Sequence, residues 1–398
     1  MSDLDRALVA LIRAGFPPFA APAETPTRSD WDWAQLVQRA QRENLAALFY
    51  VALKHSQRLA ELPRALAEQL RLMYLRADIA SWQAVRVVED LLAQFERANV
   101  PVVLLKGAAL GVVLYPDPSL RQLGDLDILV DEQDKARAAA LLQANGFAPL
   151  LDFVDGFREE LGSEQCYTRR GKQAATVDLH WHVINVPSHA RQTSVDWFWA
   201  RTMEASFGKR RAAVLNWDAQ LLHLAEHFVI HHQMRGLLWS CDVALLLALH
   251  ADELDWDEII NAARQFQVLP ALNAVLAHVD DVWGVTAPSP IRAQLAESAN
   301  GLAGRISVIV STAERTEALI LREGLSYRSW RHRASYFFHF FFPSPVYMRT
   351  RYRISHSALI PFFYLVRLGL GARRLVDSIS SIFRNARKLA RRTRQSET

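Results

Sequence analysis

Two aspartates one residue apart, Asp125 and Asp127, are the first candidates for chemistry in this chain. They lie in the run GDLDILV, whose alternation of apolar and acidic residues is typical of a β-strand over residues 125–130. Because successive strand side chains point to opposite faces, both carboxylates share one face and the apolar residues share the other. Paired carboxylates on a central strand need a cation, and their oxygens suit Mg²⁺. A turn acid beside an exposed strand acid gives the same letters, so this pair alone leaves both interpretations open.

A third aspartate, Asp178, lies in a second alternating run, VDLHWHV, over residues 177–183. On a strand, Asp178, His180 and His182 share one face and the apolar residues share the other. If this strand neighbours residues 125–130 in the sheet, three carboxylates converge. Such a group can hold two metal ions about 3.5–4 Å apart, the arrangement used in phosphoryl and nucleotidyl transfer.

The residues before the aspartates indicate where phosphates would bind. Residues 102–105 are an apolar run typical of a buried strand, and Gly107 begins an expected helix over residues 108–114. The N–H groups at a helix start bind anions, and Lys106 lies at this junction. The alternative for Lys106 is a surface residue at a strand end.

Arg121, in the loop that precedes the two aspartates, is the other basic candidate for a phosphate contact. Its alternative role is a salt bridge to Asp117 or Asp125. The sequence leaves both roles open.

The segments LLKGAAL, YPDPSLRQLGDLDILV and VDLHWHV together resemble the nucleotidyltransferase fold of the DNA polymerase beta superfamily. The resemblance is closest to its bacterial branch of uncharacterised nucleotidyltransferases. Members carry a glycine and a small residue at a helix start, then D-x-D or D-x-E, then a later single aspartate. The resemblance implies that Asp125 and Asp127 hold both metal ions and that Asp178 joins one of them.

The same resemblance implies that Gly107 and Ala108 form the turn that contacts a triphosphate. Many members have serine where this chain has Ala108, so one hydroxyl contact to phosphate is missing here. Lys106, Arg121 or backbone N–H groups at the helix start would compensate.

The function implied by this resemblance is transfer of a nucleoside monophosphate from an NTP, with ATP expected, to an acceptor, with two Mg²⁺ ions and release of pyrophosphate. The acceptor is a small molecule or a peptide or protein group that the sequence does not identify. Two alternatives stay open: a non-catalytic nucleotide-binding or scaffold protein on the same fold, and a γ-phosphotransferase.

Several histidines lie near these motifs in the sequence. His180 and His182 are expected either to face the substrate or to support Asp178 through hydrogen bonds. The branch named above also tends to have a helix with spaced histidines followed by W-x-x-D, which Trp239 and Asp242 match. This resemblance places His227 and Asp242 on the substrate side of the cleft.

His223, His227 and His231 recur every four residues, so on a helix they lie along one face. The run HLAEH also has the spacing of an inverted zincin, with Glu253 or Glu258 as the third ligand. The nucleotidyltransferase pattern spans three independent motifs, which favours nucleotidyl transfer over this rival class.

The chain is expected to have an α+β fold, with a small mixed or antiparallel nucleotidyltransferase sheet flanked by N-terminal and C-terminal helical regions. Residues 132–144 are a candidate helix inside the core. The side chains expected to face inward from it are those of Ala136, Ala140, Leu141 and Ala144. The strand candidates are residues 100–105, 125–130, 147–153, 165–169 and 174–183. The expected regions are residues 1–98 (helical), 99–213 (nucleotidyltransferase core), 214–329 (helical) and 330–398 (a basic, aromatic C-terminal extension).

Composition supports a folded protein: 51% of the 398 residues are hydrophobic and 22% are charged, enough for a sizeable core. Only two cysteines occur and neither belongs to a C-x-x-C, which argues against a disulfide scaffold. The N-terminus has no basic start followed by an apolar segment, so no secretory signal is expected. These features suit a cytoplasmic protein.

The charge is unevenly distributed along the chain. Residues 330–398 contain 14 Arg and Lys and two acids, a net charge of +12, so the preceding residues carry −8 of the total +4. Residues 373–394 form an amphipathic basic pattern. The extension is therefore expected to contact either the anionic inner face of a membrane or a protein partner. The alternative is that it packs on the rest of the protein as a helical lid. Nucleic acid is an unlikely partner because few aromatic residues interleave with the arginines.

Overall fold

The structure is a computed structural model, and it describes residues 1–19, 31–122, 124–150, 163–171, 174–183, 193–299, 324–325, 327 and 329–371. Within these residues no helix is long and apolar enough to cross a membrane. Two expectations fall partly or wholly outside the described residues: the end of the strand over 147–153 and the amphipathic pattern over 373–394.

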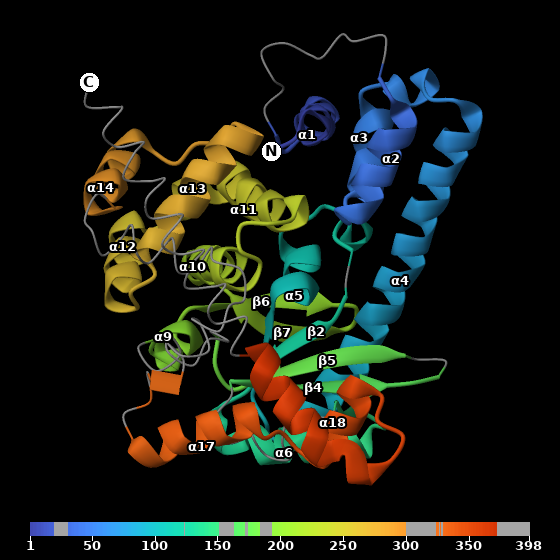
Figure 1. The fold of residues 1–398 in the computed structure, drawn as a ribbon. Coiled ribbons are helices and arrows are strands. Elements are labelled where there is room, and N and C mark those ends of the chain that lie inside the picture. Colours follow the sequence, from blue (N-terminus) through green and yellow to red (C-terminus); the bar gives the residue numbers. More distant parts are fainter. Residues whose placement is uncertain are drawn as a thin grey trace, which may run out of the picture.

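A seven-stranded mixed sheet lies at the centre of the molecule, and helices surround it (Figure 1). Its strand order is β3-β4-β5-β2-β1-β7-β6. The sheet pairs β2 with β5 and β1 with β7 in parallel, and the remaining neighbours are antiparallel. The expected α+β class is therefore confirmed. The strands are β1 (Val103–Leu105), β2 (Leu126–Leu129), β3 (Ala148–Pro149), β4 (Glu164–Arg169), β5 (Ala175–His180), β6 (Thr202–Phe207) and β7 (Arg210–Leu215).

Alternation along the strands divides the core between the two faces of the sheet. Leu104, Ile128 and Leu179 belong to a cluster with side chains of α4 (Arg64–Arg97) and α6 (Lys135–Ala144). Val103, Leu105 and Leu129 belong to a second cluster with the helices that cover the other face. The strands that carry the aspartates are thus buried on both faces, which fixes their register.

The helices on that second face come from both halves of the chain and share one core. The N-terminal set is α1 (Asp3–Gly15), α2 (Trp33–Arg42) and α3 (Ala46–His55). The later set is α10 (Trp217–Glu226), α11 (Leu237–His250), α12 (Trp256–Gln265) and α13 (Leu269–Trp283), with α14 (Ser289–Ala299) beyond it. A Cβ on Gly15 would lie 1.9 Å from the carbonyl oxygen of Ala52, so α1 and α3 approach closely only because this residue is glycine.

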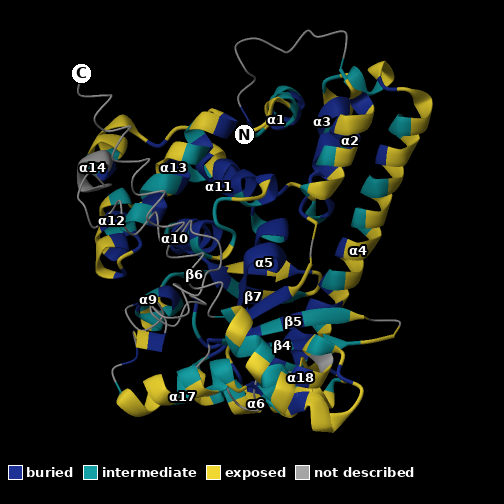
Figure 2. Cartoon of the chain, in the orientation of Figure 1, coloured by how far each residue is buried: buried dark blue, intermediate teal, exposed yellow. Residues whose placement is uncertain are grey.

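Helix α4 has 34 residues, and its two halves differ in exposure (Figure 2). Its C-terminal half packs on the sheet through buried residues such as Leu91 and Phe95. Its N-terminal half extends away from the sheet, where Leu72 and Ile79 are exposed. The shorter elements are α5 (Lys106–Val113), α9 (Val195–Trp199), α17 (Trp330–Phe341) and α18 (Pro345–Tyr352), together with one-turn helices at Arg58–Glu61, Pro118–Leu120, Glu132–Asp134, Ala251–Glu253 and Ser357–Leu359.

One local expectation is wrong, and one hairpin was not predicted. The helix expected over residues 132–144 begins as a 3₁₀ turn, and Ala138 and Leu142 face the core, whereas Ala136, Ala140 and Ala144 are exposed. The alanine-rich sequence gives little contrast between faces, so the packing of the neighbouring strands decides which one is buried. The hairpin β6–β7 was not expected at all.

Candidate active site

The three aspartates come together on one face of the sheet, where strands β2 and β5 lie side by side. These strands are parallel neighbours, and their register places Asp127 opposite Asp178. Asp125 immediately precedes β2, two residues before Asp127 and therefore on the same face. All three line a cavity of about 260 Å³, which we call the carboxylate pocket. Its lining is Asn44, Lys106, Gly107, Arg121, Gln122, Gly124, Asp125, Asp127, Glu164, Asp178, His227, His231, His232, Leu238 and Trp239.

Asp127 is the most tightly held of the three. It is 2% exposed, and its Oδ1 atom lies 2.7 Å from Lys106 Nζ and 2.9 Å from His180 Nε2. His180 is fully buried, and its Nδ1 atom lies 3.3 Å from Glu164 Oε2. The sequence suggested that His180 supports Asp178. In the structure its hydrogen bond goes to Asp127 instead.

The surroundings shift the pKa values of Asp125 and Asp127 in opposite directions. Burial alone would raise the pKa of Asp127, but the Lys106 ammonium and the His180 hydrogen bond outweigh it and hold that pKa well below its usual value. Burial, followed by the charges of Asp127 and Asp178, raises the pKa of Asp125 to about 6. Asp125 is exposed at the pocket mouth, so solvent weakens this effect.

Asp178 carries the observation that bears most directly on metal binding. Its Oδ1 atom is buried and has no hydrogen-bond partner among the described residues. A buried, unpaired carboxylate oxygen costs free energy that a bound cation would recover. Asp125 and Asp127 line the same pocket, so the acidic donors available there are carboxylate oxygens, which Mg²⁺ prefers.

The start of α5 forms the side of the pocket next to Asp127. Lys106 is the first residue of this helix and has a φ of 44°, in the left-handed region that non-glycine residues rarely adopt. Strain of this kind gathers at functional sites. It turns the Lys106 side chain inward, where it is 7% exposed, so the surface alternative is wrong. Gly107 lines the pocket, whereas the Ala108 side chain packs into the core beneath the sheet.

Arg121 and Asp242 form a buried ion pair. Arg121 Nη2 lies 2.9 Å from Asp242 Oδ2, and Arg121 Nε donates to both carboxylate oxygens. Tyr115 donates a hydrogen bond of 2.7 Å to Asp242 Oδ1. The partner of Arg121 is therefore neither Asp117 nor Asp125. Asp242 is fully buried and holds Arg121 from behind the pocket, so the substrate-side position that the sequence suggested for it is wrong.

Histidines form the opposite side of the pocket. His227 lines it as expected, but so do His231 and His232, because α10 continues into a π-helical turn over His227–His231. His223 points into the interior instead, where burial lowers its pKa to about 3.

His182 does not take the position expected from strand alternation. Strand β5 ends at His180, and His182 follows in a bend. The alternation that would have placed it beside Asp178 therefore stops too early.

The inverted-zincin alternative is wrong. Glu258 accepts hydrogen bonds from Trp197 and Arg201, and Glu253 pairs with His250. Glu226 is buried and forms no ion pair with another described residue. Burial raises the pKa of its carboxyl to about 8.

Glu164 is a pocket residue that the sequence analysis missed. It is the first residue of β4 and lies opposite His180 in the β4–β5 register. The expected strand began one residue later, at Gln165, which left Glu164 outside it. The sequence signal for this strand is weak, because polar residues occur on both of its faces, including Gln165 and Arg169 opposite Cys166 and Thr168.

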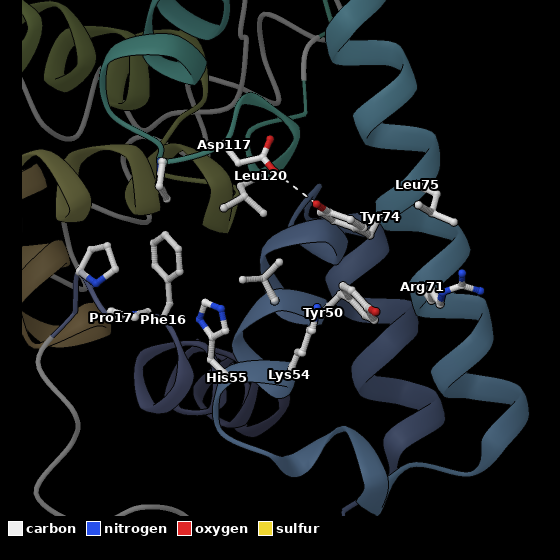
Figure 3. Close-up of a pocket in the computed structure, with 13 residues that line it drawn as sticks. Phe16, Pro17, Tyr50, Lys54, His55, Arg71, Tyr74, Leu75, Asp117 and Leu120 are labelled. Atoms are coloured by element: carbon white, nitrogen blue, oxygen red, sulfur yellow. Dashed lines mark hydrogen bonds between the residues drawn. The ribbon is translucent and has the colours of Figure 1, made fainter.

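A larger cavity, of about 570 Å³, lies away from the aspartates (Figure 3). Side chains of α3 and α4, including Tyr50 and Tyr74, form one side of it, and Phe16 forms another. Its one carboxylate among the described lining residues, Asp117, accepts a hydrogen bond from the Tyr74 hydroxyl. With a single and already bonded carboxylate, this cavity has no group of converging acids, so the carboxylate pocket is the better candidate for catalysis.

One comparison with known proteins shows the family of this chain. A family model described as uncharacterised nucleotidyltransferase matches residues 29–284. Among solved structures, the chain is similar to the crystal structure of an antigenic nucleotidyltransferase-like protein from Paracoccidioides brasiliensis, at 14% identity and a TM-score of 0.36, over 53% of this chain and 96% of that one. No curated protein matches the chain. The family match includes every lining residue of the carboxylate pocket and ends before the C-terminal extension.

Proposed function

Because the chain belongs to the uncharacterised nucleotidyltransferase family, we propose that it transfers a nucleoside monophosphate from an NTP, with ATP expected, to an acceptor. The acceptor's hydroxyl, phosphate or amine attacks the α-phosphorus. A new bond to that phosphorus forms, the bond from it to the bridging oxygen breaks, and pyrophosphate leaves. The observation that supports this best is the convergence of Asp125, Asp127 and Asp178 in one pocket.

Asp125, Asp127 and Asp178 are the residues that would hold Mg²⁺, as two ions. When bound, Mg²⁺ neutralises charge on the leaving pyrophosphate and lowers the pKa of the attacking group. The wider assignment to the DNA polymerase beta superfamily is part of this proposal.

The other pocket residues would bind and orient the nucleotide. The first N–H groups of α5, at Lys106, Gly107 and Ala108, point out of the helix start, and within the described chain no side chain caps them. They can donate to a phosphate, which is how Ala108 would contribute although its side chain is in the core. Lys106 adds positive charge at the same place, and His180 keeps Asp127 in position.

We place the acceptor in a neighbouring groove of about 570 Å³ that shares Gly124 and Asp125 with the carboxylate pocket. Gln83 and Arg86 of α4 and Thr176 of β5 also line it. A nucleotide in one cavity and an acceptor in the other would meet at Asp125. In-line displacement needs this arrangement, because the attacking and leaving groups must lie on opposite sides of the phosphorus.

The test is to incubate the full chain with Mg²⁺, acceptor pools and ATP labelled at either the α- or the γ-phosphate. We expect the α-label to enter an acceptor, with release of pyrophosphate, and Asp178→Asn to abolish this. Transfer of the γ-label alone would replace the proposal with phosphotransfer. If calorimetry finds no Mg²⁺-dependent binding of any NTP, catalysis is excluded and a scaffold role takes its place.

We also propose that the C-terminal extension contacts an anionic membrane surface. Its exposed large apolar side chains are Trp330, Phe338, Phe342, Val346, Leu359, Phe362, Leu365 and Leu370. Arginines lie between them in the sequence, including Arg331, Arg349 and Arg351. Exposed apolar groups next to positive charge are typical of interfacial binding.

A further inference from the structure

Three histidine rings gather at the mouth of the carboxylate pocket, and we call them the histidine cluster: His227, His231 and His232. One ring nitrogen of each lies within 4.8 Å of one nitrogen of both others. The ring centroids of His227 and His231 are 4.9 Å apart, those of His227 and His232 are 4.6 Å apart, and those of His231 and His232 are 4.9 Å apart. Among the described residues, this is the group of three whose ligand atoms could hold one metal ion.

The backbone conformation is what brings the third ring into the cluster. In an α-helix, residues i and i+4 share a face, but residue i+5 lies about 140° away from i. Here His227–His231 form a π-helical turn, and His232 N donates to His227 O at 3.1 Å, an i+5 hydrogen bond. With about 4.4 residues per turn, positions i+4 and i+5 lie on either side of i. The turn therefore places all three imidazoles together.

The chain after the cluster is unusual too. Gln233 and Met234 both have positive φ values, of 54° and 58°, in the left-handed region that non-glycine residues rarely adopt. The cluster is thus held by two rare backbone features in succession, a π-turn and a left-handed pair. Both features are common at ligand-binding sites.

The Trp239 side chain packs against two rings of the cluster. The Trp239 ring stacks on His232 at 4.0 Å, with 14° between the planes, and presents an edge to His227 at 5.4 Å. Arg121 lies over the same tryptophan at 5.1 Å and is fixed by Asp242. Rings that are already oriented lose little freedom when they bind a ligand.

We propose that His227, His231 and His232 bind one divalent transition-metal ion of the Zn²⁺ class. Imidazole nitrogens suit Zn²⁺, Co²⁺ and Ni²⁺, whereas Mg²⁺ prefers the oxygens of the three aspartates. The site therefore differs from the proposed Mg²⁺ site in donor type as well as in position. It goes beyond the proposed nucleotidyl transfer and can be tested without it.

The distances permit this site after small side-chain movements. Tetrahedral Zn²⁺ has Zn–N bonds of 2.0–2.1 Å, which puts two ligand nitrogens about 3.4 Å apart. No pair in the cluster therefore needs to close by more than about 1.4 Å, which a rotation of the exposed His231 side chain can supply.

Three histidines leave the fourth position of the metal open, as in catalytic zinc sites. Because the cluster and the aspartates line the same pocket, this open position faces the space where a nucleotide or acceptor would lie. A water molecule or a donor atom of the substrate would complete the coordination.

The first experiment measures binding of the metal alone to the full chain, free of any histidine tag and stripped with a chelator. Zn²⁺ is titrated by calorimetry, and Co²⁺ is followed by its visible spectrum, which reports coordination geometry. We expect one equivalent of each ion and a tetrahedral or five-coordinate Co²⁺ spectrum with nitrogen ligands.

Variants then assign the site. His231→Ala and His232→Ala should each weaken Zn²⁺ affinity by more than about tenfold, since losing even an outer-shell partner costs 10–100-fold. His55→Ala, at an exposed histidine of α3, is the matched control and should bind as the unmodified protein does. Thermal unfolding of each variant establishes that it is folded. Neither position is deeply buried, so both variants should fold.

Two results would overturn the proposal. One is Zn²⁺ binding by the unmodified protein no greater than that of a folded His231→Ala/His232→Ala double variant. The other is an octahedral, oxygen-rich Co²⁺ spectrum that disappears in Asp125→Asn, which would place the ion on the aspartates. Asp125→Asn should instead keep the Zn²⁺ site, so a failure of this inference and a failure of the proposed nucleotidyl transfer can be told apart.

Discussion

Lys106 Nζ and Asp127 Oδ1 lie 2.7 Å apart in a part of the pocket where both residues are almost fully buried. The lysine is the first residue of α5 and the aspartate lies within β2, so the ion pair joins the proposed phosphate-binding side of the pocket to the proposed metal-binding side. Such a pair is costly to break from one side only, because a buried charge is then left uncompensated.

Removing Lys106 should therefore destabilise the fold. We expect Lys106→Met to lower the free energy of unfolding by about 3 kcal/mol. The double variant Lys106→Met/Asp127→Asn should recover at least 1 kcal/mol of this, because the unpaired charge is gone. Urea denaturation of the four proteins gives the coupling energy. Additive losses would show that the two charges do not interact.

The raised pKa of Asp125 predicts a stability that depends on pH in the metal-free protein. Its pKa is about 6 in the folded state and near 3.8 in the unfolded chain, so the folded protein binds more protons between these values. Stability should accordingly fall as pH rises from about 4 to 6 and stay low above that range. Asp125→Asn should remove this penalty and stabilise the metal-free protein at pH 7 by about 1 kcal/mol, a figure reduced for solvent exposure.

Without metal, Asp125→Asn should be more stable than the unmodified protein at pH 7, and added Mg²⁺ should make the unmodified protein the more stable of the two. The unmodified protein should gain in melting temperature when Mg²⁺ is added at pH 7, and Asp125→Asn should gain little, since it lacks one ligand. Melting curves with and without Mg²⁺ at pH 5 and pH 7 measure both effects. An Asp125→Asn variant that responds to Mg²⁺ as strongly as the unmodified protein would remove Asp125 from the proposed metal ligands.

The buried ion pair of Arg121 and Asp242 is expected to stabilise the fold. Asp242→Asn should lower the free energy of unfolding by about 3 kcal/mol, because it leaves a buried guanidinium without its counter-charge. Tyr115→Phe, which removes one neutral donor to the same carboxylate, should cost only about 1 kcal/mol. An Asp242→Asn variant that unfolds like the unmodified protein would show that this ion pair does not stabilise the fold.

Vesicle binding tests the proposed partner of the C-terminal extension. The full chain should sediment with vesicles containing anionic lipid, bind neutral vesicles far less, and be released by salt, because arginines supply part of the attraction. Phe362→Asp/Leu365→Asp should abolish sedimentation. The two positions are 59% and 68% exposed, so the fold should tolerate the change. Equal binding by this double variant would show that these side chains do not contact the lipid.

The convergence of the aspartates could be anticipated from the sequence because it rests on a local rule. Strand alternation alone puts Asp125 and Asp127 on one face, and the sheet then needs only β5 beside β2. The partner of His180 could not be anticipated in this way. It depends on the register between two strands about fifty residues apart, which places Asp127 beside Asp178 and within reach of His180.

The misses have physical causes that differ from one another. The π-turn at His227–His231 leaves no mark in the sequence, because its hydrogen-bond pattern depends on how α10 packs. The hairpin β6–β7 carries Glu204 and Arg211 on its exposed side and lies at the sheet edge, so its apolar pattern is weak. A turn signal was present in Gly208, whose φ is 60°.

The wide spacing of the pocket residues along the chain has a consequence for when the pocket can form during synthesis. The pocket draws on Asn44 near one end of the family match and on Trp239 towards the other, so no short fragment contains it. A growing chain cannot assemble this cavity until α11 has left the ribosome. Products that end before α11 therefore lack part of the pocket lining, and we expect the proposed activity only from molecules complete at least to that helix.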